Sequence, residues 1–381
     1  MADAVRHGNG EVRMDAEEES TVHKALTAPE PNDPAKPAWP WQIPARSWRY
    51  VLRRTWSEFW YRHILDNAGN LAYMSVQSLF PGLLAILAGL TLLGQGTAAV
   101  EWMIEFLASI APDAVVDLVA DPLRQLARAA GADWVLGIAL IGALWAASGY
   151  VAAFGRSANR IHGVVEGRPI WQIIPYNLLV TLLMLVFGAF VLLVVLLSAG
   201  IWEVVLDYLG LDDGPLRALR GNRWVVLAIA SLVAVLALYR ATPNVRQAKL
   251  RWSIPGALFA MGATVLAIVG FSAWVAEFGR LPASYGIVGS FIILLLGLWI
   301  MNIALLIGVA LNAEIERARL LAGGFPAERE LLVQPRNTRM IQARTAEEDW
   351  LAERAGELRG QATGHSQPSR RPRKSSDGSP S

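Results

Sequence analysis

The sequence predicts an all-α polytopic membrane protein with six transmembrane helices, and three observations predict this class. Six stretches have apolar interiors free of Asp, Glu, Lys and Arg and are long enough to cross a bilayer, which takes about 20 apolar residues. Of the 381 residues, 54% are hydrophobic and 17% are charged, against about 25% charged in soluble domains. Because lipid cannot satisfy backbone polar groups, spans of this composition form helices.

The predicted membrane domain covers residues 67–322. Its spans are expected at about 68–94, 134–154, 171–202, 223–240, 252–276 and 283–313. The fourth is the shortest, and it crosses the bilayer if Trp224 and Tyr239 lie in the headgroup layers. In the fifth span Gly256, Ala260 and Thr264 recur every four residues, a pattern that allows close packing of helices.

Two segments precede the first span. Residues 1–45 are acidic and then proline-rich, which predicts a disordered cytoplasmic N-terminus. In residues 46–66, Trp48, Leu52, Trp56 and Phe59 recur at helical spacing among arginines, which predicts an amphipathic helix in the membrane interface. The alternative is an aromatic juxtamembrane belt without a separate helix.

Two further segments lie outside the spans. Residues 97–132 have apolar and charged stripes at helical spacing, which predicts an outer amphipathic segment that lies on lipid or covers the mouth of a cavity. Residues 323–381 follow Gly323-Gly324 and mix charges with Ser, Pro and Gly, which predicts a mostly disordered cytoplasmic tail.

Loop charges set the orientation. Basic residues precede span one and link spans two to three and four to five, whereas the opposite loops carry most of the acids. Positive loops stay in the cytoplasm, so both termini are expected there. The first apolar run starts near residue 68, and no cleavable signal peptide is visible before it.

Polar residues inside the spans form a candidate polar seam, which consists of Gln77, Ser78, Ser148 and Asn302. They either line one pathway between spans one, two and six or only make hydrogen bonds between helices. A water-lined path through Gln77, Ser148 and Asn302 would favour transport. Full hydrogen bonding within the bundle would favour a scaffold.

A candidate cytoplasmic gate lies at the ends of spans two and six and consists of Arg156, Asn159, Asn312 and Glu314. One hypothesis pairs Arg156 with Glu314, and the alternative is two unrelated charges near helix ends. The two spans also share a loose sequence echo. Leu144-Trp145 precedes Gly155 and Asn159 much as Leu298-Trp299 precedes Gly308 and Asn312, with one residue of difference in the spacing.

Several short motifs occur in a characteristic order. They are Asn70 to Pro81, Leu144-Trp145-Ala-Ala-Ser148-Gly149, Asn159-Arg160, Arg168-Pro169, Leu238-Tyr239-Arg240 with Pro243, Pro255-Gly256-Ala257-Leu258, Ser284-Tyr285-Gly286, and Leu298-Trp299 with Asn302 and Gly308. Over about Trp56 to Leu320 the chain resembles the YihY/BrkB family of bacterial inner-membrane proteins, often labelled ribonuclease BN-like. The resemblance implies a multi-pass protein of the bacterial inner membrane.

Composition and spacing argue against the ribonuclease label. The chain has no cysteine, and no two of its five histidines have metal-ligand spacing. Neither a nucleotide-binding motif nor a soluble domain for RNA is visible. We therefore expect no catalytic residues, no metal, no cofactor and no nucleic-acid partner.

The function expected from the sequence is transport or handling of a lipid or hydrophobic solute without nucleotide hydrolysis. The expected partners are membrane lipids and, in addition, a protein partner or a second copy of the chain. The alternative is a membrane scaffold whose tails and outer segment form an interaction surface, and a membrane-surface enzyme ranks last.

Overall fold

The structure is a computed structural model that describes residues 16–61, 63–92, 133–197, 222–278 and 281–365, with isolated residues between 100 and 124. The α-helices are α1 (Ala16–Thr27), α2 (Ala45–Tyr61), α3 (Ile64–Leu92), α6 (Asp133–His162), α7 (Ile170–Leu197), α10 (Arg223–Ala241), α11 (Ile254–Phe278), α12 (Leu281–Ala322) and α13 (Arg339–His365). Two 3-10 turns, η1 (Pro40–Gln42) and η2 (Leu250–Trp252), and a bridge between Val245 and Pro335 complete the described elements. The predicted all-α class is confirmed over these residues.

Four of the described helices are long and apolar enough to cross a membrane. The apolar segments are Ile170–Val191 of α7, Arg223–Ala241 of α10, Ile254–Trp274 of α11 and Phe291–Ala322 of α12. The first two predicted spans coincide with α3 and α6, which have 29 and 30 residues. That these two also cross the membrane stays a prediction.

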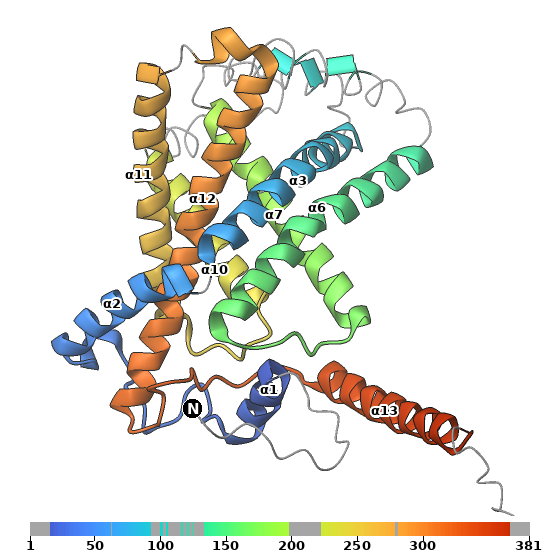
Figure 1. The fold of residues 1–381 in the computed structure, drawn as a ribbon. Helices are drawn as coiled ribbons and strands as arrows, with labels where there is room; N and C mark the ends of the chain where they lie inside the picture. The colour runs from blue at the N-terminus through green and yellow to red at the C-terminus, as the bar shows by residue number, and fades with distance from the viewer. Residues whose placement is uncertain are drawn as a thin grey trace, which may run out of the picture.

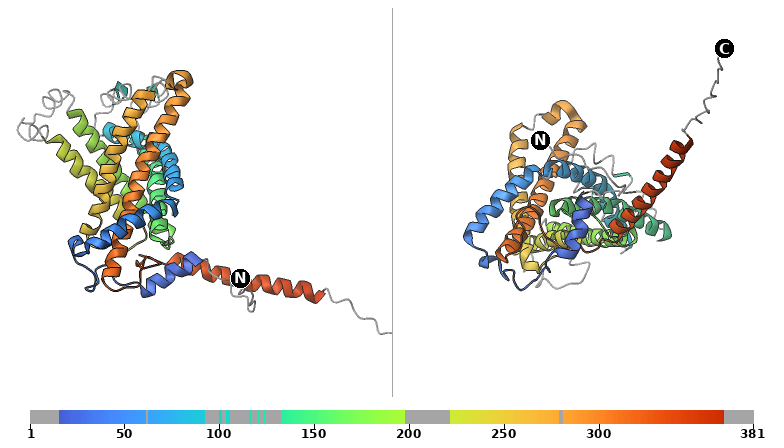
Figure 2. Two further views of the ribbon diagram at one scale, coloured as in Figure 1. Left: turned by 60° about the vertical axis from the view of Figure 1, so that its left-hand side comes forward. Right: turned by 60° about the horizontal axis from the view of Figure 1, so that its bottom comes forward.

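The helices converge at one end of the molecule, which we call the basal end. It carries α1, the start of α7, the connection between α10 and α11, and the chain after α12 (Figure 1). In the bundle α3 packs on α6, α11 packs on α12, and α12 also contacts α3. Away from the basal end the helices diverge, with α7 and α10 leaning away from α12 (Figure 2). The buried core, including Phe154, Ala257 and Leu306, lies where they converge.

Small residues bring α11 and α12 into close contact near the basal end. A Cβ atom added to Gly308 would lie 2.6 Å from the Gly256 carbonyl oxygen and 2.8 Å from Ala260 Cβ. Both distances are shorter than van der Waals contact, so only hydrogen fits at Gly308. Gly256 and Ala260, which the sequence pattern singled out, therefore lie at a helix–helix contact.

Helix α2 is a separate amphipathic helix, so the alternative of a belt without a helix is wrong. Val51, Thr55 and Glu58 are buried, and Val51 packs with Leu311 and Ile315 of α12. On the opposite side Trp56 and Trp60 are 67% and 57% exposed. Exposed tryptophans on a helix at the edge of the bundle suit a membrane interface, and that location stays a prediction.

The predicted disorder of residues 1–45 is not confirmed for residues 16–45, which form α1 and η1 and pack at the basal end. Arg319 of α12, itself buried, donates hydrogen bonds to the carbonyl oxygens of Pro31 (2.7 Å) and Pro37 (2.9 Å). Its guanidinium also lies 4.7 Å from the ring of Trp252. Proline restricts the unfolded chain, so ordering this segment costs less entropy than its composition implies.

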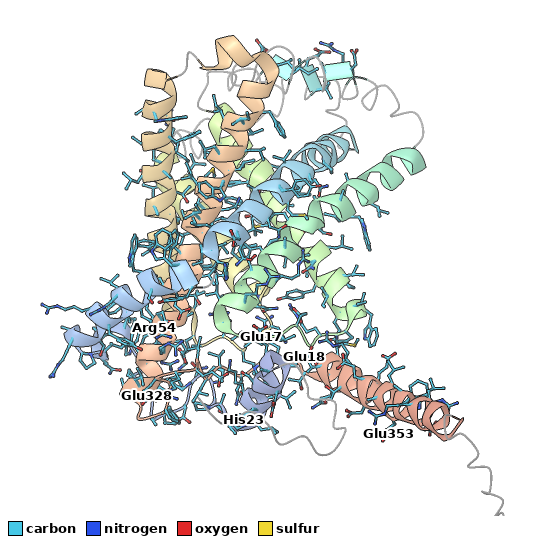
Figure 3. All side chains as sticks on the ribbon, viewed as in Figure 1. Glu17, Glu18, His23, Arg54, Glu328 and Glu353 are labelled. Atoms are coloured by element: carbon cyan, nitrogen blue, oxygen red, sulfur yellow. The ribbon has the colours of Figure 1, made fainter. Side chains whose placement is uncertain are left out.

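The predicted disorder of residues 323–381 is likewise not confirmed for the part that the structure describes, residues 323–365. Leu331 and Val333 are buried in the basal core, and Arg246 N donates to the Gln334 carbonyl oxygen at 2.8 Å. Beyond them α13 extends away from the bundle, as the position of Glu353 shows (Figure 3). The predicted outer segment 97–132 lies mostly outside the described residues. Within it Arg124 pairs with Glu101 at 3.1 Å.

Candidate functional site

Asn302 is the buried centre of the predicted polar seam. Its Oδ1 accepts a hydrogen bond from the Tyr150 hydroxyl of α6 at 2.9 Å, and its Nδ2 donates to the Leu298 carbonyl oxygen at 2.8 Å. A longer contact of 3.3 Å joins Nδ2 to Ser75 Oγ of α3. Asn302 therefore links α12 to α6 and α3, as expected for a polar residue that joins helices in lipid.

The other seam residues do not meet Asn302. Gln77 is exposed and donates to the Tyr73 hydroxyl at 2.9 Å within α3. Ser78 and Ser148 each donate to a backbone carbonyl of their own helix, at 3.1 and 2.7 Å. The structure thus brings Asn302 to Tyr150 and Ser75 rather than to the three residues predicted beside it. Of the four, only Asn302 hydrogen bonds to other described helices, and whether these side chains line a pathway or only pack stays a prediction.

An apolar cavity of about 270 Å³ lies beside the hydrogen-bonded pair of Tyr150 and Asn302. Its lining comes from five helices, α3, α6, α7, α10 and α12, and consists of Ser78, Ala147, Tyr150, Val151, Thr181, Met184, Leu185, Phe187, Ala234, Val235, Leu238 and Leu305. The hydroxyls among them are engaged, since Tyr150 donates to Asn302 and Thr181 to the Asn177 carbonyl oxygen at 2.7 Å. The cavity therefore presents mainly hydrocarbon to a ligand.

The predicted gate residues have other partners than expected. Glu314 is buried and accepts from Arg317 Nε at 2.9 Å, and Arg54 Nε of α2 lies 3.8 Å away (Figure 3 labels Arg54). Arg156 is exposed and lines a different pocket at the basal surface. The hypothesis of an Arg156–Glu314 pair is therefore wrong. A buried carboxylate needs a partner, and Arg317, one turn further along α12, supplies it.

Asn159 and Asn312, the other two gate residues, bind backbone at the connection between α10 and α11, Asn159 within it and Asn312 at its last residue and the first turn of α11. Asn159 Oδ1 accepts from Asn244 N at 2.6 Å. Asn312 Oδ1 accepts from Gly256 N at 2.9 Å, and its Nδ2 donates to the Ser253 carbonyl oxygen at 3.1 Å. These asparagines fix the connection rather than open a passage.

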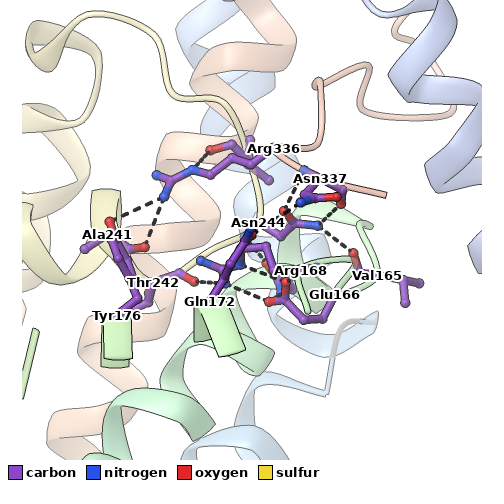
Figure 4. Close-up of polar contacts among 12 residues, drawn as sticks. Val165, Glu166, Arg168, Gln172, Tyr176, Ala241, Thr242, Asn244, Arg336 and Asn337 are labelled. Carbon is purple, nitrogen blue, oxygen red and sulfur yellow. Dashed lines mark hydrogen bonds and ion pairs between the residues drawn. The ribbon is translucent and has the colours of Figure 1, made fainter. Parts of the chain in front are cut away.

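A polar network around Asn244 ties three basal segments together (Figure 4). Asn244 Nδ2 donates to the carbonyl oxygens of Val165 (3.1 Å) and Asn337 (2.9 Å), and its Oδ1 accepts from Asn337 N at 3.1 Å. Arg168 pairs with Glu166 at 2.7 Å and donates to the Thr242 carbonyl oxygen at 2.8 Å. Sequence reasoning missed this network, although Arg168-Pro169 and Pro243 had marked its place.

Comparison with known proteins gives the family. The sequence pattern described as virulence factor BrkB matches residues 55–330. This chain belongs to the BrkB family. A relative named as a ribonuclease-like protein, YfkH of Bacillus subtilis (strain 168), is 28% identical over 275 residues, which cover 72% of this chain and 98% of YfkH. No solved structure matches the chain.

Two relatives carry membrane-protein names. A UPF0761 membrane protein of Alkalilimnicola ehrlichii is 28% identical over 298 residues, 77% of this chain and 62% of that protein. The UPF0761 membrane protein PSHAa0171 of Pseudoalteromonas translucida is 26% identical over 267 residues, 68% of this chain and 85% of that protein. Together with the apolar helices, these names identify the BrkB chain as a membrane protein. The BrkB match leaves out α1 and α13. It includes all residues that line the cavity and, in the Asn244 network, every residue except those after residue 330.

Proposed function

We propose that this BrkB-family membrane protein binds a lipid or another hydrophobic solute in the cavity between its helices and transports it without hydrolysing nucleotide. The apolar lining of the cavity carries this proposal. Burial of apolar surface contributes about 25 cal/mol per Å², so a hydrocarbon chain or ring is the ligand that such a lining favours. The volume of about 270 Å³ is close to the lower end of small-molecule pockets, about 300 Å³.

The setting of the cavity agrees with a lipid ligand. Its lining residues on α7 and α10 belong to helices long and apolar enough to span a membrane. Outward-facing residues of α7, such as Leu183 and Val186, are exposed as well, as expected for a lipid-facing helix. A solute in the cavity would therefore exchange with the bilayer more readily than with water.

We further propose that the protein resides in a bacterial inner membrane with its basal end in the cytoplasm. The basal end carries Arg156, Arg160, Arg246 and Arg336, and the sequence bias of basic residues supports a cytoplasmic location. The N-terminal and C-terminal parts of the chain both lie at the basal end, because α1 and the segment after α12 pack there.

An enzymatic role has less support. Hydrolysis of RNA needs metal ligands or an acid and a base at hydrogen-bond distance from the reacting atoms. Among the residues that the structure describes, no group of three His, Asp or Glu side chains is placed to hold a metal ion. The ribonuclease-like name belongs to YfkH, and we do not extend it to this chain.

A pair of adjacent substitutions tests the cavity. Ala147 is 5% exposed and lines the cavity, whereas Ala146 beside it on α6 is exposed. Ala147→Phe should fill the cavity, and Ala146→Phe adds the same side chain on the outer surface. Native mass spectrometry of gently extracted protein should show a lipid or amphiphile enriched over its bulk abundance in the wild type and in Ala146→Phe, and lost in Ala147→Phe.

The same experiment distinguishes the scaffold alternative, which one observation favours. Helix α13 stands away from the bundle and exposes Trp350, Leu351 and Leu358. A preparation without an enriched lipid but with a stoichiometric protein partner would refute transport and support the scaffold. Equal lipid retention by Ala147→Phe and Ala146→Phe would exclude this cavity as the binding site.

A further inference from the structure

A second, larger pocket opens at the basal surface, outside the apolar cavity. Its volume is about 990 Å³. Its walls are α1, the residues around the start of α3, the end of α6, the residues 163–166 that follow it, and residues 329–331. Helix α1 forms one wall because Lys24, 2% exposed, donates to the Gly163 carbonyl oxygen at 2.6 Å and pairs with Glu330 at 3.0 Å.

Three of the four acids that line this pocket have a partner among the described residues. Glu330 pairs with Lys24, and Glu166 is held at 2.7 Å by Arg168, which is not part of the lining. Asp66 accepts from His63 at 3.1 Å. Glu17, on α1, is the remaining lining acid among the residues that the structure describes.

Three arginines supply positive charge to the same pocket. Arg156 and Arg160 are one turn apart on α6, so their side chains leave the same face of the helix. Arg160 donates to Asn67 Oδ1 at 2.8 Å, which orients its guanidinium beside the start of α3. Arg156 is exposed and forms no ion pair with any described residue. Arg329, in the chain after α12, also lines the pocket.

We propose that this pocket binds the phosphate group of an anionic ligand, with Arg156 and Arg160 as its principal contacts. Guanidinium groups bind phosphate through two parallel N–H···O hydrogen bonds, and two of them one turn apart can hold one phosphate from two sides. This site is independent of the function proposed for the apolar cavity, because neither arginine lines that cavity.

Two sources offer such a phosphate, a phospholipid headgroup and a water-soluble phosphate. The position of the pocket admits a headgroup, since Tyr61 lines it and the neighbouring Trp60 is exposed on α2, the predicted interfacial helix. Basic pockets on the cytoplasmic side of membrane helices bind anionic headgroups by the same chemistry.

The test uses the full chain in detergent and two probes, phosphatidylglycerol and inorganic phosphate, with binding read by native mass spectrometry. Arg156→Gln removes one guanidinium without breaking a described ion pair. Arg339→Gln, at an exposed position on α13, removes the same charge outside the pocket and serves as the control. Arg156→Gln removes one charged hydrogen-bonding group from the pocket, so it should weaken the binding of whichever probe the wild type binds by about tenfold. Arg339→Gln should leave that binding unchanged.

Each outcome is decisive. If phosphatidylglycerol binding weakens in Arg156→Gln and millimolar inorganic phosphate does not displace the lipid, the pocket is a headgroup site. If inorganic phosphate itself binds and that binding depends on Arg156, the ligand is a soluble phosphate. Equal affinity of Arg156→Gln and the wild type for both probes overturns the proposal. Because Ala147→Phe leaves this pocket intact, failure here and failure of the cavity proposal are separable.

Discussion

Replacement of Gly308 by alanine tests the packing of α11 against α12. The added Cβ would meet the Tyr239 hydroxyl, the Gly256 carbonyl oxygen at 2.6 Å and Ala260 Cβ at 2.8 Å. Backbone and Cβ atoms cannot rotate away, so α11 and α12 would have to separate. The Tyr239 hydroxyl, which donates to the Leu305 carbonyl oxygen at 2.6 Å, would have to move as well.

The expected change in stability follows from opposing terms. Alanine is favoured over glycine inside a helix by about 1 kcal/mol. Overpacking costs about 1–3 kcal/mol, and loss of the Tyr239 hydrogen bond about 1 kcal/mol more. Gly308→Ala should therefore destabilise the protein by about 1–3 kcal/mol. Gly262→Ala, on the exposed side of α11 with no atom within 4 Å of the new Cβ, should stabilise it by up to about 1 kcal/mol.

Thermal unfolding in detergent, followed by tryptophan fluorescence, measures the contrast. The chain has 15 tryptophans and no cysteine, so intrinsic fluorescence suits it and thiol-reactive dyes do not. A difference of about 1–4 kcal/mol between the two variants corresponds to roughly 1–5 °C in Tm for a chain of 381 residues, at about 2.1 cal/mol/K of unfolding entropy per residue. If Gly308→Ala is as stable as Gly262→Ala, the close contact between the two helices does not exist as described.

The docking of α1 yields two further predictions. Lys24→Met removes the hydrogen bond to Gly163 and the ion pair with Glu330. Amide hydrogen exchange in α1 should therefore accelerate about tenfold or more, while exchange in α11 stays unchanged. Leu26→Ala, a substitution at an exposed position of α1, serves as the control. Burial raises the pKa of the Glu330 carboxyl, but hydrogen bonds from Ser20 and Lys24 and the charge of Lys24 outweigh it and leave the pKa below 4.5. The contribution of Glu330 to docking should thus be complete above pH 4.5 and disappear as the pH falls through the lowered pKa, and Glu330→Gln should remove this dependence of α1 exchange on pH.

The membrane helices could be predicted from the sequence because their signal is local. Each apolar stretch satisfies its own backbone in lipid, so composition and length suffice to place α7, α10, α11 and α12. The helical spacing of Trp48, Leu52 and Trp56 placed α2 for the same reason. The small-residue pattern around Gly256 also located the contact with α12, because close approach of helices requires small side chains at regular spacing.

The basal end could not be predicted because its contacts join residues far apart in the chain. Lys24 meets Gly163, and Arg319 meets Pro31 and Pro37. Composition predicted disorder for the proline-rich segment, since it contains few residues that form a core by themselves. The carbonyl oxygens of that segment are instead bound by an arginine of α12, and no pattern within residues 1–45 carries this information.

The loose sequence echo between α6 and α12 has a physical counterpart at the connection between α10 and α11. In each helix a glycine permits close approach here. A Cβ on Gly155 would lie 3.2 Å from the carbonyl oxygen of Thr242, in this connection, and one on Gly308 would lie 2.6 Å from that of Gly256, in the first turn of α11. In each helix an asparagine four residues later accepts a backbone N–H, Asn159 from Asn244 and Asn312 from Gly256.

These paired contacts bear on the transport that we propose. Both α6 and α12 are fastened to one connection, so a relative movement of the two helices at the basal end must break at least one of these hydrogen bonds. Further from that end, a hydrogen bond from Tyr150 of α6 to Asn302 of α12 joins the two helices beside the apolar cavity. The cavity therefore lies at the boundary between a tied basal end and helices that diverge beyond it. A change in the spread of those helices can alter the cavity while the Asn244 network stays intact.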